Sequence, residues 1–170
     1  RLLRLDSNDI GNEEAEILAN SLEHNTALTT LLLGGNKFKE VGLRAFLKLL
    51  NNVSSIEQTY KSNHSLIALG LPEFIDSKSI QMKNQIQHFL GINWSTDDAG
   101  DIGQTKVIRT QLNSNTRMEL CNLQGIDYSY NSIFAGIDDV LLPNIMALTG
   151  KHHGQDELYR MLIATAPELV

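Results

Sequence analysis

With 170 residues, 42% of them hydrophobic and 20% charged, the chain has the composition of an ordinary globular protein, which excludes an intrinsically disordered one. The 14 Lys and Arg residues against 20 Asp and Glu give a net charge of -6 without any basic cluster, so we expect no nucleic-acid partner. No apolar run approaches the roughly 18 residues that cross a bilayer, so we expect no membrane association either.

The first predicted element belongs to an internal repeat. The segment Leu-Arg-Leu-Asp-Ser-Asn at 3–8 returns 28 positions later as Leu-Leu-Leu-Gly-Gly-Asn at 31–36. In both segments the leucines alternate at period two, which predicts short strands at 3–5 and 31–33 with their leucines facing one core. A period of roughly 20–29 residues on this frame is typical of a leucine-rich solenoid, a class of protein that binds partners.

Each strand is followed by an amphipathic helical pattern. Counted from Asn8 or Asn36, apolar residues recur at offsets 7, 10, 11 and 14, which keep one helical face. The asparagine itself can satisfy backbone groups that a sharp turn would leave unpaired, because its amide both donates and accepts. The residues expected in the core are Ile10, Ala15, Leu18, Ala19 and Leu22 in the first unit, and Phe38, Leu43, Phe46, Leu47 and Leu50 in the second.

The third strand arrives late. Residues 63–71 repeat the spacing of residues 25–33, but 38 positions on instead of 28, so ten residues are inserted. A helix near 40–50, a turn, and a second helix capped by Ser54 or Ser55 accommodate this insert. We expect the strand at 69–71 to pair in parallel with the other two. Pro72 then ends the strand series.

The frame Leu-x-x-Leu-x-Leu-x-x-Asn-x-(Ile/Phe), followed by a helix and a closing Asn-Thr-Ala-Leu at 25–28, resembles the ribonuclease-inhibitor-like subtype of leucine-rich repeats. The resemblance implies an α/β fold, a solenoid of short parallel strands and convex helices over residues 1–72. Since Arg1 stands immediately before a strand, we expect a C-terminal fragment of a longer array.

From residue 73 onward the apolar spacing is helical. We expect helices near 79–90, 103–112, 130–148 and 156–166, with a polar loop at 95–101. This part resembles a helical extension that closes many ribonuclease-inhibitor-like repeat proteins predicted from unicellular algae. Because a solenoid exposes its last strand edge, we expect residues 73–170 to form an all-α cap or a docking domain.

Two groups of polar residues invite a chemical interpretation. His152 and His153, followed by Asp156, suggest a metal site, but adjacent residues point apart on a helix or a strand. Asp138 and Asp139 fail as a catalytic dyad for the same reason. We therefore expect neither a metal nor a cofactor, and interpret both groups as solvated side chains.

Cys121 is the only cysteine, so the chain cannot form an intrachain disulfide. This favours a reducing compartment, and we expect a cytoplasmic protein. Without a nearby histidine in the sequence, Cys121 is interpreted as a small buried hydrophobic residue.

The remaining candidate surface is the concave face of the sheet, opposite the core leucines. Leu32 is the strongest candidate for a residue that anchors a bound partner, although a single exposed leucine needs no special explanation. The positions expected to contact a partner are Arg4, Asp6, Leu32, Gly34, Ala68 and Gly70.

The sequence therefore predicts a non-enzymatic scaffold that presents a concave parallel sheet to a protein partner. Two alternatives rest on the same resemblance to leucine-rich-repeat proteins: an actin-capping protein of the tropomodulin kind and a GTPase-activating scaffold of the Ran-regulating kind. A third alternative, from a different class, is an enzyme with a pocket of ionisable groups in the helical part.

Overall fold

The computed structural model describes residues 1–73, 76–95, 99–111 and 114–127, together with Pro143 and Ala147. The chain divides into two compact units. Unit 1 comprises residues 1–52 and 62–102, and unit 2 comprises residues 53–61 and 103–170. Apart from Pro143 and Ala147, the helices predicted near 130–148 and 156–166 lie outside the described residues.

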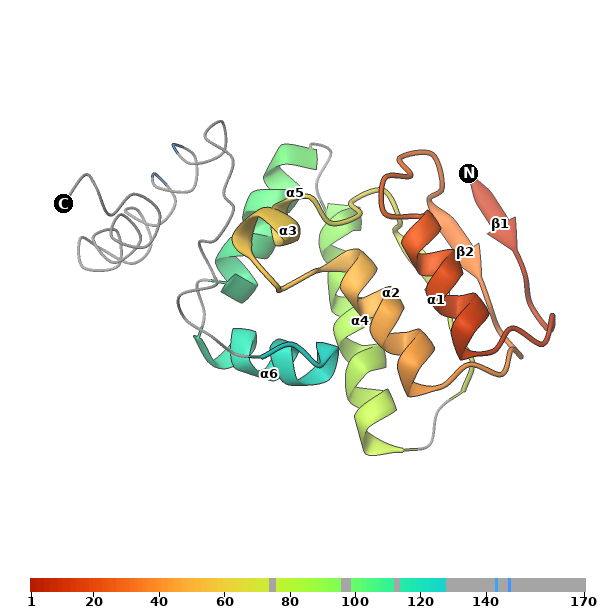
Figure 1. The fold of residues 1–170 in the computed structure, drawn as a ribbon. Coiled ribbons are helices and arrows are strands. Elements are labelled where there is room, and N and C mark those ends of the chain that lie inside the picture. The colour runs from red at the N-terminus through yellow and green to blue at the C-terminus, as the bar shows by residue number, and fades with distance from the viewer. Residues whose placement is uncertain (74–75, 96–98, 112–113, 128–142, 144–146, 148–170) are drawn as a thin grey trace. The chain divides into compact units, whose positions relative to one another are not determined.

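Unit 1 alternates strands with helices (Figure 1). Its elements are β1 (Leu2–Arg4), α1 (Asn12–Ser21), β2 (Thr30–Leu32), α2 (Glu40–Leu50), β3 (Ala68–Gly70) and α4 (Ser77–Ser95). The strands form one parallel sheet in the order β1-β2-β3, with Leu31 beside Leu3 on one side and Leu69 on the other. The predicted parallel pairing is confirmed, and each strand begins one residue earlier than predicted.

The predicted fold class, a leucine-rich-repeat solenoid with a helical cap, is wrong. The described residues are mostly helical, with six α-helices against one small sheet of three strands, each only three residues long. The physical reason is the short extent of the repeat, because the strand frame recurs cleanly only once and ends after β3. Three short strands do not build a solenoid, in which stacked repeats create a continuous core.

The core of unit 1 lies between the sheet and the layer formed by α1, α2 and α4 (Figure 1). The strand residues Leu31 and Leu33 and the helix residues Phe46 and Leu50 are all fully buried, as the strand and helical periodicities predict. Leu3 differs from its equivalent Leu31, because it is 38% exposed on the edge strand β1.

The side chain of Asn36 satisfies backbone polar groups of the turn that follows β1, a role that the sequence predicts for this residue. Its Oδ1 accepts the backbone N–H groups of Asn8 at 2.9 Å and Ile10 at 3.1 Å. Its Nδ2 donates to the carbonyl oxygens of Leu5 and Leu33, both at 2.8 Å. One buried amide therefore joins the ends of two neighbouring strands.

Three further asparagines, Asn25, Asn63 and Asn93, form a series that we call the asparagine ladder. The Oδ1 of Asn25 and of Asn63 accepts the backbone N–H groups two and three residues later. The Nδ2 of Asn63 donates to the carbonyls of Leu22 and Asn25 at 2.9 and 3.0 Å. The Nδ2 of Asn93 donates to the carbonyls of Asn63 and Leu66, at 3.2 and 2.7 Å. The ladder ties α4 to the turn that precedes β3.

Unit 2 is helical over its described residues. It contains α3 (Ile56–Tyr60), a π-helical turn η1 (Val107–Gln111) and α6 (Ser114–Gln124), while α5 (Ala99–Lys106) begins in unit 1 and ends in unit 2. The side chain of Ser55 accepts the N–H of Gln58 at 3.1 Å, so its predicted role as an N-cap is confirmed. The predicted polar loop at 95–101 is shorter than expected, because α4 reaches Ser95 and α5 begins at Ala99.

We expect Gly42→Ala to destabilise unit 1. A Cβ at this buried position of α2 would lie 2.8 Å from the Cβ of Phe38 and 2.9 Å from the Cβ of Ala15. Overpacking of this kind costs about 1–3 kcal/mol, which exceeds the roughly 1 kcal/mol that alanine gains in helix propensity. Urea unfolding of both proteins measures the difference. A midpoint unchanged or raised in the variant would contradict this packing.

We expect Asn63→Ala to destabilise the protein by at least about 3 kcal/mol, because it leaves two backbone carbonyls and two N–H groups without their partner. The matched control is Asn8→Ala, whose exposed side chain donates a single bond to the carbonyl of Asp6. The control should change the free energy of unfolding by less than about 1 kcal/mol. Equal losses in the two variants would argue against the ladder.

Candidate functional site

The outer face of the three-stranded sheet brings the six predicted partner-binding positions together. The register aligns Arg4, Leu32 and Gly70 in one row across the strands. Because successive side chains alternate in direction, this row faces away from the core that contains Leu31 and Leu69. We call this surface the outer sheet face; its residues are Leu2, Arg4, Asp6, Thr30, Leu32, Gly34, Ala68 and Gly70.

One end of the outer sheet face carries a fixed charge pair. The Nε of Arg4 lies 3.6 Å from Oδ2 of Asp6, and the backbone N–H of Gly34 donates to Oδ1 of Asp6 at 2.8 Å. A Cβ added at Gly34 would lie 3.1 Å from that oxygen, so glycine leaves room for this bond. An exposed ion pair contributes only about 0–1 kcal/mol to stability. The pair therefore adds little to the stability of the sheet.

The middle of the outer sheet face is apolar and is already held in place. Leu32 is half-buried, and a Cβ added at Gly70 would lie 3.1 Å from its Cδ2, so the leucine leans over the neighbouring glycine. In the adjacent row, side-chain size falls from Leu2, which is 61% exposed, through Thr30 to Ala68. The face therefore steps down from β1 towards β3.

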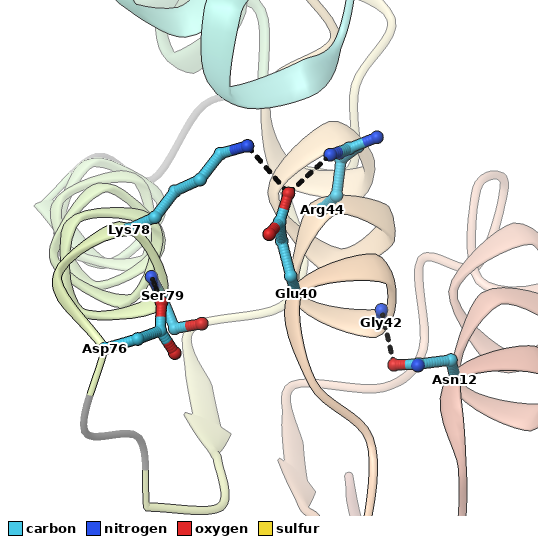
Figure 2. A network of polar contacts seen from close by, with 7 residues as sticks. All are labelled: Asn12, Glu40, Gly42, Arg44, Asp76, Lys78 and Ser79. Carbon is cyan, nitrogen blue, oxygen red and sulfur yellow. Dashed lines mark hydrogen bonds and ion pairs between the residues drawn. The ribbon is translucent and has the colours of Figure 1, made fainter.

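A second polar cluster lies at the N-terminal ends of the helices of unit 1 (Figure 2). The Oε1 of Glu40 accepts from Nη2 of Arg44 and from Nζ of Lys78, each at 2.7 Å. The hydrogen bond from Lys78 lowers the pKa of the Glu40 carboxyl. These bonds connect α2 to α4.

The other members of this cluster are helix caps (Figure 2). The Oδ1 of Asn12 accepts the N–H of Lys39 at 2.7 Å and that of Gly42 at 3.3 Å, so a residue of α1 caps α2. Asp76 caps α4 through the N–H of Ser79 at 2.8 Å, and this bond lowers the pKa of Asp76. Since its polar groups bind helix ends and each other, the cluster is structural.

Unit 2 buries charged and polar side chains that the sequence patterns did not indicate. The Nε2 of Gln111 donates to the carbonyl of Ser55 at 3.0 Å and to Oγ1 of Thr59 at 2.8 Å. Its Oε1 accepts from Nε of Arg117 at 2.9 Å. Arg117 and Lys106 are fully buried. Gln111 lies in the π-helical turn, so it connects η1 to both α3 and α6.

Burial shifts the pKa of two residues of unit 2. It lowers the pKa of Lys106 from 10.5 to about 7, because the charged amine loses its hydration. Burial also raises the pKa of the Cys121 thiol. Cys121 is buried and free, so its interpretation as a small buried residue is confirmed.

The metal and catalytic interpretations fall on His152, His153, Asp156, Asp138 and Asp139, all outside the described residues. Among the residues that the structure does describe, no three His, Cys, Asp or Glu side chains lie close enough together to hold a metal ion. No helix in the described ranges combines the length and apolarity needed to cross a membrane.

Comparisons of the chain with protein-family models, with curated proteins and with solved structures find no match. The resemblance to ribonuclease-inhibitor-like repeats therefore stays a prediction from the sequence.

We expect the contribution of Lys106 to the free energy of unfolding to rise between pH 7 and about pH 10. Lys106 loses its proton near pH 7 in the folded state, whereas the unfolded chain keeps it to near pH 10.5. Between these two pKa values folding releases the Lys106 proton, so a lower proton concentration favours the folded state by up to about 1.4 kcal/mol per pH unit.

Urea unfolding of wild type and of Lys106→Met across this pH range isolates the effect. The stability difference between the two proteins should shrink as the pH rises, because methionine has no proton to lose. A constant difference would show that Lys106 titrates alike in both states.

Proposed function

We propose that the chain is a non-enzymatic protein-binding module and that the outer sheet face is its binding surface. The observation that carries this proposal is the strand register, which places residues from positions 4, 32 and 70 in one solvent-facing row. Residues so distant in sequence form one surface only because the sheet aligns them. The partner is a protein that covers an apolar strip with one charged end.

Three properties of the outer sheet face support this function. Its centre is apolar, as the centres of protein interfaces tend to be. Leu32 is packed against Gly70 before any partner arrives, so little side-chain entropy is lost on binding. Arg4 pairs with Asp6 at the rim, where a charge contributes more to specificity than to affinity.

The polar clusters support an enzyme less well than this surface supports binding. The side chains around Glu40 join helices to one another, and those around Gln111 lie inside unit 2. We place the protein in the cytoplasm, because its single cysteine suits a reducing compartment.

The test compares Leu32→Arg with a matched control, Val41→Arg, which adds the same side chain at a helix position that is 46% exposed. Both variants and wild type, checked for folding by circular dichroism, capture partners from a lysate under the same conditions. A partner retained by Val41→Arg should bind Leu32→Arg at least about tenfold more weakly, the loss typical of a central interface residue. Identical partners and affinities for all three proteins would remove the outer sheet face as the binding surface.

A further inference from the structure

The last turn of α4, residues 91–95, contains an asparagine whose amide is only half satisfied. Asn93 is 4% exposed, and its Nδ2 donates to the carbonyls of Asn63 and Leu66. Its buried Oδ1 has no hydrogen-bond partner in the described structure. Rotating the amide by half a turn would not satisfy it, because Oδ1 would then face the carbonyl oxygens of Asn63 and Leu66. A buried acceptor without a donor is a source of instability.

The asparagine ladder shows how the same atom is satisfied elsewhere. The Oδ1 of Asn63 accepts the N–H of Ser65 at 3.0 Å and that of Leu66 at 2.9 Å, in a turn outside any helix. Asn93 is followed two positions later by Ser95, as Asn63 is by Ser65. At Asn93, however, the chain is helical, and helical geometry commits the N–H of Ser95 to the carbonyl four residues earlier.

Gly91 weakens the helix at the same place. It is exposed, and a Cβ built on it would meet nothing within 4 Å. Close packing therefore does not require glycine here, in contrast to Gly42 in α2. Glycine in a helix interior favours the unwound state about fivefold relative to alanine. A weak helical position thus lies two residues before the unsatisfied acceptor.

We propose that the last turn of α4 is a conformational switch between a helix and an asparagine turn. In the unwound state the Oδ1 of Asn93 accepts the N–H of Ser95, as the Oδ1 of Asn63 accepts that of Ser65. The two bonds from its Nδ2 stay in place, so α4 remains attached to the ladder while its end moves. Trp94, which is 73% exposed and the only tryptophan, moves with the turn. The switch does not depend on the proposed binding function.

Amide hydrogen exchange, measured by NMR on the full chain, tests the switch. The N–H of Trp94 loses its helical bond in the asparagine turn and gains no new acceptor there, so it should exchange at least about tenfold faster than that of Ile86 in the middle of α4. The N–H of Ser95 is bonded in both states and should exchange more slowly than that of Trp94, whereas simple fraying would expose Ser95 first. Gly91→Ala should slow the exchange at Trp94 by about fivefold. Asn84→Ala is the matched control, since it changes another exposed position of α4 and should leave exchange at Trp94 unchanged.

A second variant tests the role of the Asn93 amide. Asn93→Asp replaces the donating nitrogen with an oxygen that faces two carbonyls, so at pH 7 exchange at Trp94 should rise more than tenfold over wild type. Below about pH 4 the carboxyl regains a proton to donate, and the ratio to wild type should fall. Exchange at Trp94 as slow as at Ile86 and unaffected by Gly91→Ala would overturn the switch, as would an Asn93→Asp ratio that does not vary with pH.

Discussion

The structure of unit 1 depends on the satisfaction of backbone polar groups where the chain passes from a helix back towards the sheet. A buried turn leaves N–H and C=O groups unpaired, and each would cost about as much as a lost hydrogen bond. Asn63 satisfies four such groups at once, two of its own turn and two of the turn before it. Because Asn63 bonds to the turn of Asn25 and Asn93 bonds to the turn of Asn63, the ladder fixes the spacing between successive strand–helix repeats and so the strand register.

The outer sheet face follows from this constraint. Its rows exist because β1, β2 and β3 are aligned residue by residue, although the chain between β2 and β3 is ten residues longer than that between β1 and β2. The extra length contains α3, which belongs to unit 2. An insertion that leaves the register of the sheet intact is tolerated, since longer loops cost little once their ends are fixed. The surface is thus insensitive to what the inserted segment does.

Sequence periodicity predicted the elements whose apolar spacing is strong, such as α2 with Leu43, Phe46 and Leu50 on one face. It also predicted the capping role of Ser55 and the turn role of Asn36, because both use side chains with a known local geometry. It gave no sign of α6, in which a buried Arg117 interrupts the apolar pattern.

The candidate site was predictable in part, since period-two alternation alone separates Arg4 and Leu32 from the core. The contact between Leu32 and Gly70 was not, because it joins residues that only the folded register makes neighbours. The solenoid prediction was wrong because it inferred the whole architecture from a local strand pattern. Three short strands do not form a solenoid.

Asn63 and Asn93 each begin an Asn-x-Ser sequence, the acceptor pattern for N-linked sugars. In both residues the nitrogen that would carry the sugar donates two hydrogen bonds to backbone carbonyls. A glycan added there before folding would remove a donor and force a bulky polar group into the interior. A sugar on either residue would therefore break the asparagine ladder, and production in a secretory host would endanger the fold itself.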